Sequence, residues 1–371
     1  MKNPSKLVSR PEKFAAPLQF DFFETDDRRI TNTIALWDVA PRGVFRATDE
    51  VRSDKSLKLL KRVFQYGGAT YQVSLTPARF ETEGEEVERY PAEREQLVEE
   101  VVRQIAVRKS RLALEGGQAE AGIGVDFSLY EIFKELERTG HKFGYHEIRD
   151  ALYILHKSHV EIVRLVDDGG KSRERVVSGT TFPNLVWADR SDPESMTKVT
   201  FNWLMSHSVM RLDFRQVDYE LLMRMPGPIE RWLYRCINHD VLFFKQSGRQ
   251  HTIRATEIVD GSGAVRRRRF RDSVTRVVEA LEWMQRENLI ASFTSTGVFE
   301  GRKKTDTEFS ITLSDAFCRE MDRSETVAAQ NRKDFELIVG GAPKDFVPAT
   351  FERKAKARKL KADRLALVAP D

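Results

Sequence analysis

The sequence predicts an α+β protein that is mainly helical, and three observations support this class. Apolar residues recur every three or four positions from Phe270 to Met284, which places them on one face of a helix. Strand-like alternation follows at residues 289–294 and 308–313, on either side of a polar and basic stretch at 297–305. A region with the same order lies upstream. Helix, strand, basic hairpin and strand is the order of a winged helix-turn-helix, so we predict two such domains in tandem, with a flexible N-terminal arm and a basic C-terminal tail.

The upstream copy is supported by matching positions in the two regions. Ser128 is expected to cap a helix that ends at Gly140, and a turn at residues 141–144 leads to the next helix. When the chain is shifted by 129 residues, apolar positions of the first copy coincide with apolar positions of the second. The matching pairs are Ile148 and Val277, Ala151 and Ala280, Leu152 and Leu281, Leu155 and Met284, and Val160 and Leu289. This spacing indicates an internal duplication.

The remaining segments complete the predicted organisation of the chain. Prolines interrupt residues 1–56, which we therefore interpret as an arm with short interaction motifs. The other parts are residues 57–206, the first winged-helix domain, suited to dimerisation or backbone contact; 207–322, the second winged-helix domain and main DNA reader; and 323–371, a C-terminal helix and basic tail. Within the first two domains we expect an exposed acidic loop at 81–94, a helix of about five turns from Pro91, a strand at 197–204 and a short helix at 214–225.

Arginine is concentrated at the start of the downstream helix, residues 266–271. A solvated helix start is the simplest interpretation of a charge cluster. Helix N-termini disfavour cations, however, so arginine here favours a nearby phosphate. The predicted hairpin adds a second basic cluster, and the first copy is less basic. The candidate DNA contacts outside the downstream helix are Arg302, Lys303 and Lys304 in the hairpin, and Lys142, Tyr145 and Arg149 in the first copy.

Composition and motifs exclude several classes of function. The net charge is +4, the cysteines are Cys236 and Cys318, and no apolar run suits a signal peptide or a membrane span, so we expect a cytoplasmic protein. The Gly-rich residues 116–124 lack the Lys-Ser/Thr of a phosphate-binding loop, and no His-apolar-His triplet suits a nicking enzyme. His141, Tyr145 and His146 lack neighbouring ligands. We expect no catalytic residues, no metal and no cofactor.

One pentad in the predicted arm resembles a known interaction motif. Gln19-Phe20-Asp21-Phe22-Phe23 resembles the bacterial sliding-clamp-binding peptide, Gln-Leu-Asp-Leu-Phe in its usual form, with Phe in place of both Leu. An extended arm can place apolar anchors in a surface groove while glutamine provides polar register. The alternative is that these phenylalanines pack the arm onto its own domain.

A wider resemblance follows from the order of the elements and from a second motif. Ala35-Leu36-Trp37-Asp38, followed by Arg42-Gly43 and Arg46, is similar to a stretch ahead of the first winged unit in TrfA-like proteins. With tandem winged helices, the chain resembles iteron-binding plasmid replication initiators of the Rep/TrfA kind over residues 35–320. The resemblance implies a homodimer in equilibrium with monomer. It also implies binding of direct repeats at a plasmid origin, opening of A·T-rich duplex, and recruitment of host initiator, replicative helicase and sliding clamp.

The resemblance also assigns roles to residues of the downstream helix. The residues implied to read bases are Arg269, Asp272, Thr275, Arg276 and Glu279, and those implied to hold phosphates are Arg266, Arg267, Arg268, Arg271, Lys303 and Lys304. Two other functions stay open at this stage. One is a dimeric winged-helix transcriptional repressor without a direct replication role. The other, which the absence of ligand spacing disfavours, is a nuclease or relaxase.

Overall fold

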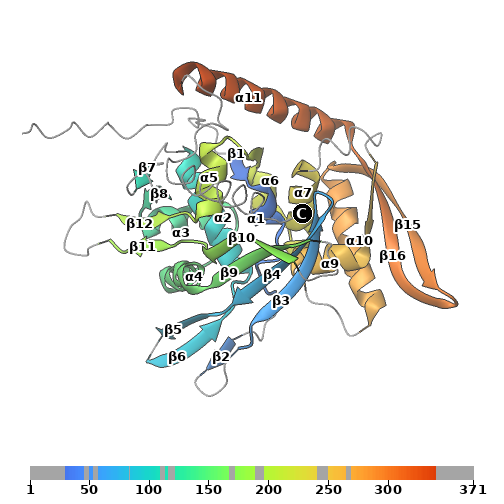
Figure 1. Ribbon diagram of the computed structural model, residues 1–371, viewed down its shortest axis with the longest axis horizontal. Helices are drawn as coiled ribbons and strands as arrows, with labels where there is room; N and C mark the ends of the chain where they lie inside the picture. The colour runs from blue at the N-terminus through green and yellow to red at the C-terminus, as the bar shows by residue number, and fades with distance from the viewer. Residues whose placement is uncertain are drawn as a thin grey trace, which may run out of the picture.

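The computed structural model describes residues 30–45, 50–52, 57–82, 84–108, 113–115, 122–166, 172–188, 196–239, 250–264 and 269–339. These residues form a mixed structure of helices and several small antiparallel sheets (Figure 1). Strands take a larger share than the sequence indicated, so the expectation of a mainly helical protein is not confirmed. None of the described helices combines the length and apolar character needed to cross a membrane.

Three helices and three strands between residues 228 and 313 pack together. These elements are α7 (Pro228–His239), β14 (Gln250–Arg254), α9 (Ala255–Ser262), α10 (Phe270–Arg286), β15 (Ile290–Glu300) and β16 (Lys303–Leu313). Strand β14 is the one of these described elements that the sequence did not predict. The strands pair antiparallel in the order β14-β16-β15, and the helices pack against one another. We call this set the C-terminal unit. The polar stretch expected as a basic hairpin is the distal part of β15 and β16, which pair almost to the turn at Gly301.

Helix α10 forms because its apolar residues share one face. Val277, Ala280, Leu281 and Met284 are all fully buried against the rest of the C-terminal unit. The helix ends where Asn288 adopts a left-handed backbone with φ of 59°, so that the Leu289 N–H donates to the Met284 carbonyl at 2.9 Å. The opposite face stays in solvent, as the sequence predicted.

An upstream set of elements repeats this order, and we call it the N-terminal unit. Its elements are α2 (Glu93–Arg108), β8 (Gly122–Phe127), α3 (Leu129–Arg138), α4 (Tyr145–Lys157), β9 (His159–Val166) and β10 (Ser172–Thr180). Every residue of the five matching pairs is 3% exposed or less. Ser128 caps α3 with a full capping box. The order and the buried positions of the predicted duplication are therefore confirmed.

The two units differ in the way their strands pair. In the C-terminal unit β14 pairs with β16, whereas β8 pairs with β7 (Ala113–Glu115) and with β12 (Thr197–Thr200), which also pairs with β11 (Asn184–Val186). Strand β9 instead extends a sheet of order β10-β9-β4-β3, through β4 (Ala69–Thr76) and β3 (Leu60–Tyr66). Strands of the N-terminal unit therefore belong to larger sheets than the strands of the C-terminal unit.

Several local predictions were wrong. The predicted acidic loop is a hairpin of β5 (Ala78–Thr82) and β6 (Glu85–Arg89), which β2 (Glu50–Arg52) extends. The predicted strand at 197–204 ends early because Asn202 caps α5 (Trp203–Met210), and the predicted helix at 214–225 divides into β13 (Arg215–Asp218) and α6 (Tyr219–Arg224). Asp218 caps α6. In both stretches, therefore, the secondary structure changes at a helix N-cap residue. The final helix, α11 (Asp315–Val339), begins at the expected Ser314 cap, whose hydroxyl accepts from the Phe317 N–H at 3.0 Å.

The segment from residue 30 to residue 45 is packed, so the predicted arm cannot extend to residue 56. Strand β1 (Ile30–Thr33) pairs with β13, and α1 (Ala35–Val39) packs against α7. Trp37 is fully buried, and the Trp232 indole donates to the Val39 carbonyl at 2.9 Å. This segment therefore lies between the two units and contacts both. Residues 1–29 lie outside the described part of the chain.

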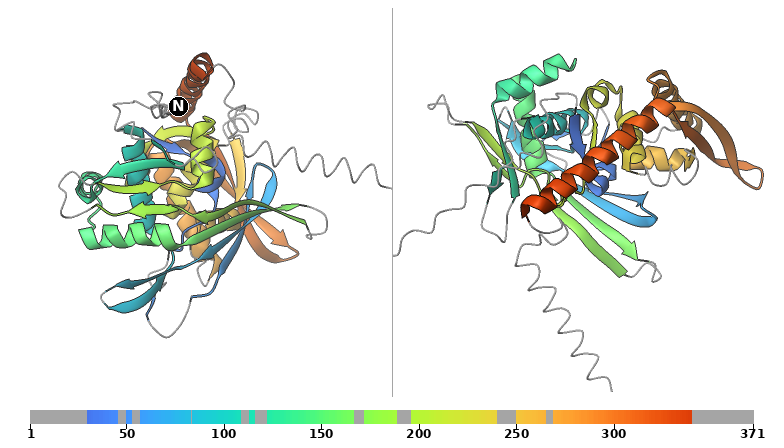
Figure 2. Two further views of the ribbon diagram at one scale, coloured as in Figure 1. Left: turned by 60° about the vertical axis from the view of Figure 1, so that its left-hand side comes forward. Right: turned by 90° about the horizontal axis from the view of Figure 1, so that it is seen from above.

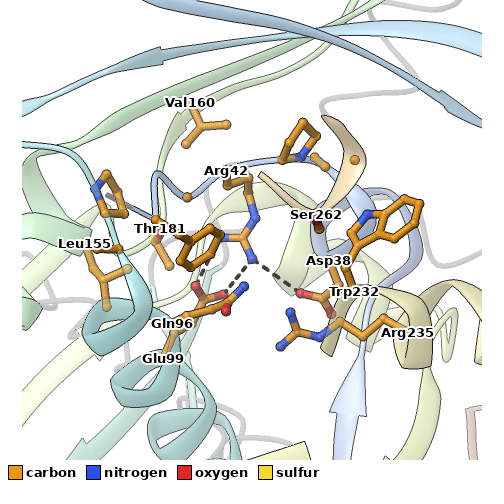
Figure 3. A pocket seen from close by; sticks show the side chains of 17 residues that line it. Asp38, Arg42, Gln96, Glu99, Leu155, Val160, Thr181, Trp232, Arg235 and Ser262 are labelled. Atoms are coloured by element: carbon orange, nitrogen blue, oxygen red, sulfur yellow. Dashed lines mark hydrogen bonds and ion pairs between the residues drawn. The ribbon is translucent and has the colours of Figure 1, made fainter. Parts of the chain in front are cut away.

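A cluster of buried charges joins α1, α2 and α7, and Figure 3 shows Asp38, Arg42, Glu99 and Arg235 of this cluster. We call it the seam cluster: Asp38, Arg42, Glu99, Glu100, Arg103 and Arg235. Arg103 donates to Asp38 at 2.9 Å and to Glu99, and Arg42 donates to Glu99 at 3.0 Å. Arg235 pairs with Glu100, which links α7 directly to α2.

The acids of the seam cluster titrate unequally. Burial opposes ionisation of Asp38, but Arg103, Arg235 and Arg42 outweigh burial and hold its pKa well below the usual range. The pKa of Glu99 is also lowered, because Arg42 and Arg103 overcome the same burial. Burial raises the pKa of Glu100. The adjoining cavity of about 30 Å³ is lined by several of these paired groups, so we interpret the cluster as a structural joint between the units.

Gly261 in α9 provides a first test of this packing. A Cβ atom added at Gly261 would lie 2.2 Å from the Trp232 ring, and the hydrogen bond to Val39 fixes that ring. We expect Gly261→Ala to lower the free energy of unfolding by about 1–3 kcal/mol, although alanine favours a helix. Urea unfolding followed by circular dichroism measures the change. Gly179→Ala, in β10 with no atom within 4 Å of the added Cβ, is the control.

Candidate nucleic-acid interface

The outward face of α10 presents a row of polar and charged side chains. Arg269, Arg271, Asp272, Thr275 and Glu279 are all exposed. The Arg271 side chain is 76% exposed and approaches Asp272 at 3.5 Å, while the Thr275 hydroxyl donates back to the Arg271 carbonyl at 3.0 Å. An exposed pair at this distance is weak and can be exchanged for a phosphate. The face can therefore present at least two arginines to an anionic partner.

The first turn of α10 strengthens this attraction. Arg269 is the N-cap residue, and no side chain caps the helix there. The unpaired N–H groups of a helix start attract anions, and arginine beside them adds formal charge. Arg266, Arg267 and Arg268 precede this point in the sequence but lie outside the described residues, so their predicted role stays a prediction.

Arg276 occupies a different position from the one its predicted role requires. Its guanidinium donates to both carboxylate oxygens of Glu230, at 2.8 and 3.1 Å, and Glu230 is fully buried in the first turn of α7. A Cβ added at Gly227 would lie 2.9 Å from the same guanidinium. A charge that neutralises a buried carboxylate cannot leave it without cost. We therefore reassign Arg276 from base reading to joining α10 to α7.

The β15–β16 hairpin forms the second basic surface. Gly301, with φ of 61°, makes the turn, and Arg302, Lys303 and Lys304 lie exposed at or beside it. The hairpin extends beyond the rest of the described structure, next to α10 (Figures 1 and 2). Its distal half is exposed on both faces of β15. Within the described part of the chain, the hairpin therefore presents its basic tip to solvent.

A buried contact fixes the direction of this hairpin. Asp306 of β16 is 6% exposed and accepts hydrogen bonds from the hydroxyl and backbone N–H of Thr256, in the first turn of α9. Asp306 also accepts from the Thr307 N–H at 2.7 Å. The carboxylate thereby caps the start of α9 and ties it to the hairpin. Helix α10 packs against both α9 and β15, so the two basic surfaces belong to one packed unit.

The candidate contacts of the N-terminal unit are in a different environment. Lys142 and Tyr145 are exposed, and Tyr145 stacks on Phe133 with ring centroids 5.0 Å apart. Arg149 lies over the Trp187 ring at 5.0 Å. These contacts hold Tyr145 and Arg149 against the protein, and only Lys142 resembles the free cations of the C-terminal unit. Their predicted role in DNA binding stays a prediction.

The turn before α4 also serves a structural role. His141 bonds through Nε2 to the Met223 carbonyl at 3.0 Å, which joins the N-terminal unit to α6. Among the described residues, no three His, Cys, Asp or Glu side chains converge as metal ligands.

Comparison with known proteins gives structural matches only. No protein-family model matches the chain, and no curated protein matches it. A selenomethionine crystal structure of domains 2 and 3 of RctB has a TM-score of 0.42 and 9% identity, covering 75% of this chain and 96% of that one. A second RctB structure of domains 2–3 gives 0.39 and 8%, with 76% and 98% covered. The Pi initiator protein in complex with iteron DNA gives 0.35 and 10%, with 59% and 91% covered.

Proposed function

We propose that the chain is a plasmid DNA replication initiator that binds repeated origin sites sequence-specifically. One observation carries the proposal: within the described residues, α10 and the β15–β16 hairpin present two exposed basic surfaces on one packed unit. In this proposal the C-terminal unit is a winged helix-turn-helix. Helix α10 enters the major groove with Arg269 facing bases, and the hairpin is the wing that holds phosphates.

The N-terminal unit has a supporting role in the proposal. It repeats the order of elements but lacks a basic start to α4, so we assign it to backbone positioning and to an equilibrium between monomer and homodimer. The seam cluster holds the two units in a fixed relation, which suits sites repeated at a constant spacing. Opening of the neighbouring duplex would draw on binding free energy and DNA deformation. Recruitment of host initiator, helicase and sliding clamp is part of the proposal, and for the clamp it depends on Gln19–Phe23.

Duplexes from the DNA that flanks the gene provide the test. We expect the full chain to protect several directly repeated sites there, each about two helical turns long, and to bind them far more tightly than random duplex of equal length. Footprinting and a filter-binding titration at fixed salt measure both properties. Equal affinity for repeated and random duplex would refute sequence-specific initiation.

A dimeric winged-helix repressor is the second candidate. It is favoured by the N-terminal unit, whose large sheet and sparse basic charge suit an interface between two copies. A repressor of this kind should protect one inverted repeat over its own promoter, because two-fold protein symmetry matches operator symmetry. The arrangement of protected sites, direct or inverted, therefore distinguishes the two functions.

A further inference from the structure

An apolar side chain projects near the tip of the basic hairpin. Phe299 is 60% exposed and lies at the end of β15, directly opposite Lys304 in the register. Single exposed apolar residues are common and need no explanation by themselves. Three features of its surroundings distinguish Phe299 from such a residue: the ring is held in place, cations flank it, and the hairpin fixes its position relative to α10.

The ring is held by a glycine and a lysine stem. A Cβ added at Gly297 would lie 2.7 Å from Cε2 of Phe299 and 3.4 Å from Cε of Lys304. The ring therefore occupies the space that only a glycine leaves free on this face. The pairing register shifts between Val298 and Phe299, which leaves Thr305 of β16 without a partner position in β15, and the Thr305 hydroxyl donates to the Val298 carbonyl at 3.3 Å. A bulge bends the strand that carries the extra residue, and this irregularity lies in β16 beside Phe299.

The length of the hairpin determines what the ring can reach. Strand β15 has 11 residues. At about 3.3 Å per residue it spans roughly 36 Å, about three times the width of a major groove. With α10 in the major groove, the hairpin tip can therefore reach the neighbouring minor groove. Arg302, Lys303 and Lys304 would meet the phosphates that border it.

We propose that Phe299 is a wedge that inserts between two base pairs in the minor groove beside the α10 site and unstacks them. Minor-groove proteins insert apolar side chains in this way, with flanking cations on the backbone, and kink the duplex. This inference rests on the proposed function. It adds a named residue that weakens base stacking next to the bound site, at a step where pyrimidine–purine sequence makes the distortion easiest.

The test uses a short duplex selected from a random pool by the full wild-type chain, with 2-aminopurine replacing one adenine at a time. We expect wild type to raise the fluorescence severalfold at one step outside the α10 footprint, as unstacking requires. Phe299→Ala should abolish this rise while its affinity for the duplex stays within about threefold of wild type. Phe299→Leu should keep most of the rise. Leu59→Ala, which removes a side chain that is 51% exposed in another part of the molecule, should change nothing.

Three results would overturn the inference. The first is an unchanged rise with Phe299→Ala, and the second is no rise at any position although wild type binds the duplex. The third is a change of oligomeric state with Phe299→Ala, seen by light scattering, while the fluorescence rise persists, which would make Phe299 a contact between copies. Failure of wild type to select or bind any duplex would instead refute the proposed function.

Discussion

Replacing Arg103 by methionine is expected to lower the free energy of unfolding by about 3–5 kcal/mol. Arg103 is 4% exposed and donates to Asp38 and to Glu99, which are 3% and 1% exposed. Without the guanidinium, the carboxylates of Asp38 and Glu99 remain buried and lose one of the positive charges that balance them. Part of the loss will appear as protonation of Asp38, since burial raises the pKa of this carboxyl group and Arg103 is the largest of the influences that lower it. Urea unfolding at neutral pH measures the loss.

Two further variants test whether an uncompensated buried charge is the cause. Arg103→Met combined with Glu99→Gln removes one carboxylate as well, and should recover part of the lost stability. Lys134→Ala removes a lysine of α3 that pairs with Glu137 at 2.8 Å, with side chains 50% and 56% exposed, and should leave the free energy of unfolding almost unchanged. A loss for Arg103→Met no larger than that of Lys134→Ala would show that the seam cluster does not hold the units together.

The periodic elements could be predicted from the sequence because their signals are local. Helix α10 was placed correctly from apolar spacing alone, and the duplication followed from it, because a buried helix face must repeat every three or four residues. The capping residues Ser128 and Ser314 were also found, since a cap bonds within its own first turn. Among the candidate DNA contacts of α10, Asp272, Thr275 and Glu279 are exposed on its outward face.

Contacts between distant residues could not be predicted. Glu99 and Arg103 stand four residues apart, which in a sequence is typical of a solvent-exposed helix pair, yet both are buried against α1. Strand β1 pairs with β13, far along the chain, and short segments of that kind carry no periodic signal. Arg276 is a further example. Its ion pair depends on the position of Glu230 in α7, which the sequence of α10 does not reveal.

Replacing Arg302, Lys303 and Lys304 together by alanine is expected to lower affinity for duplex DNA roughly tenfold to a hundredfold at physiological salt. These side chains are exposed on the hairpin, so their removal leaves no buried partner uncompensated. Each phosphate contact contributes about 0.9 to the slope of log affinity against log salt, so the slope should become shallower by about 2–3. Because phosphates carry no sequence information, selected and random duplexes should lose affinity equally.

Arg269→Ala provides the contrast that separates the wing from the reading helix. If Arg269 contacts a base edge, its loss should reduce the difference in affinity between selected and random duplex by about 1–3 kcal/mol and change the salt slope little. Arg79→Ala, which removes a cation of β5 that is 63% exposed, should alter neither quantity. Titrations of each variant over a range of salt give both slope and discrimination. If the triple substitution reduced the difference in affinity between selected and random duplex, and Arg269→Ala reduced only the salt slope, the roles of hairpin and helix would have to be exchanged. If neither variant changed the affinity or the salt slope, the DNA would bind on another surface.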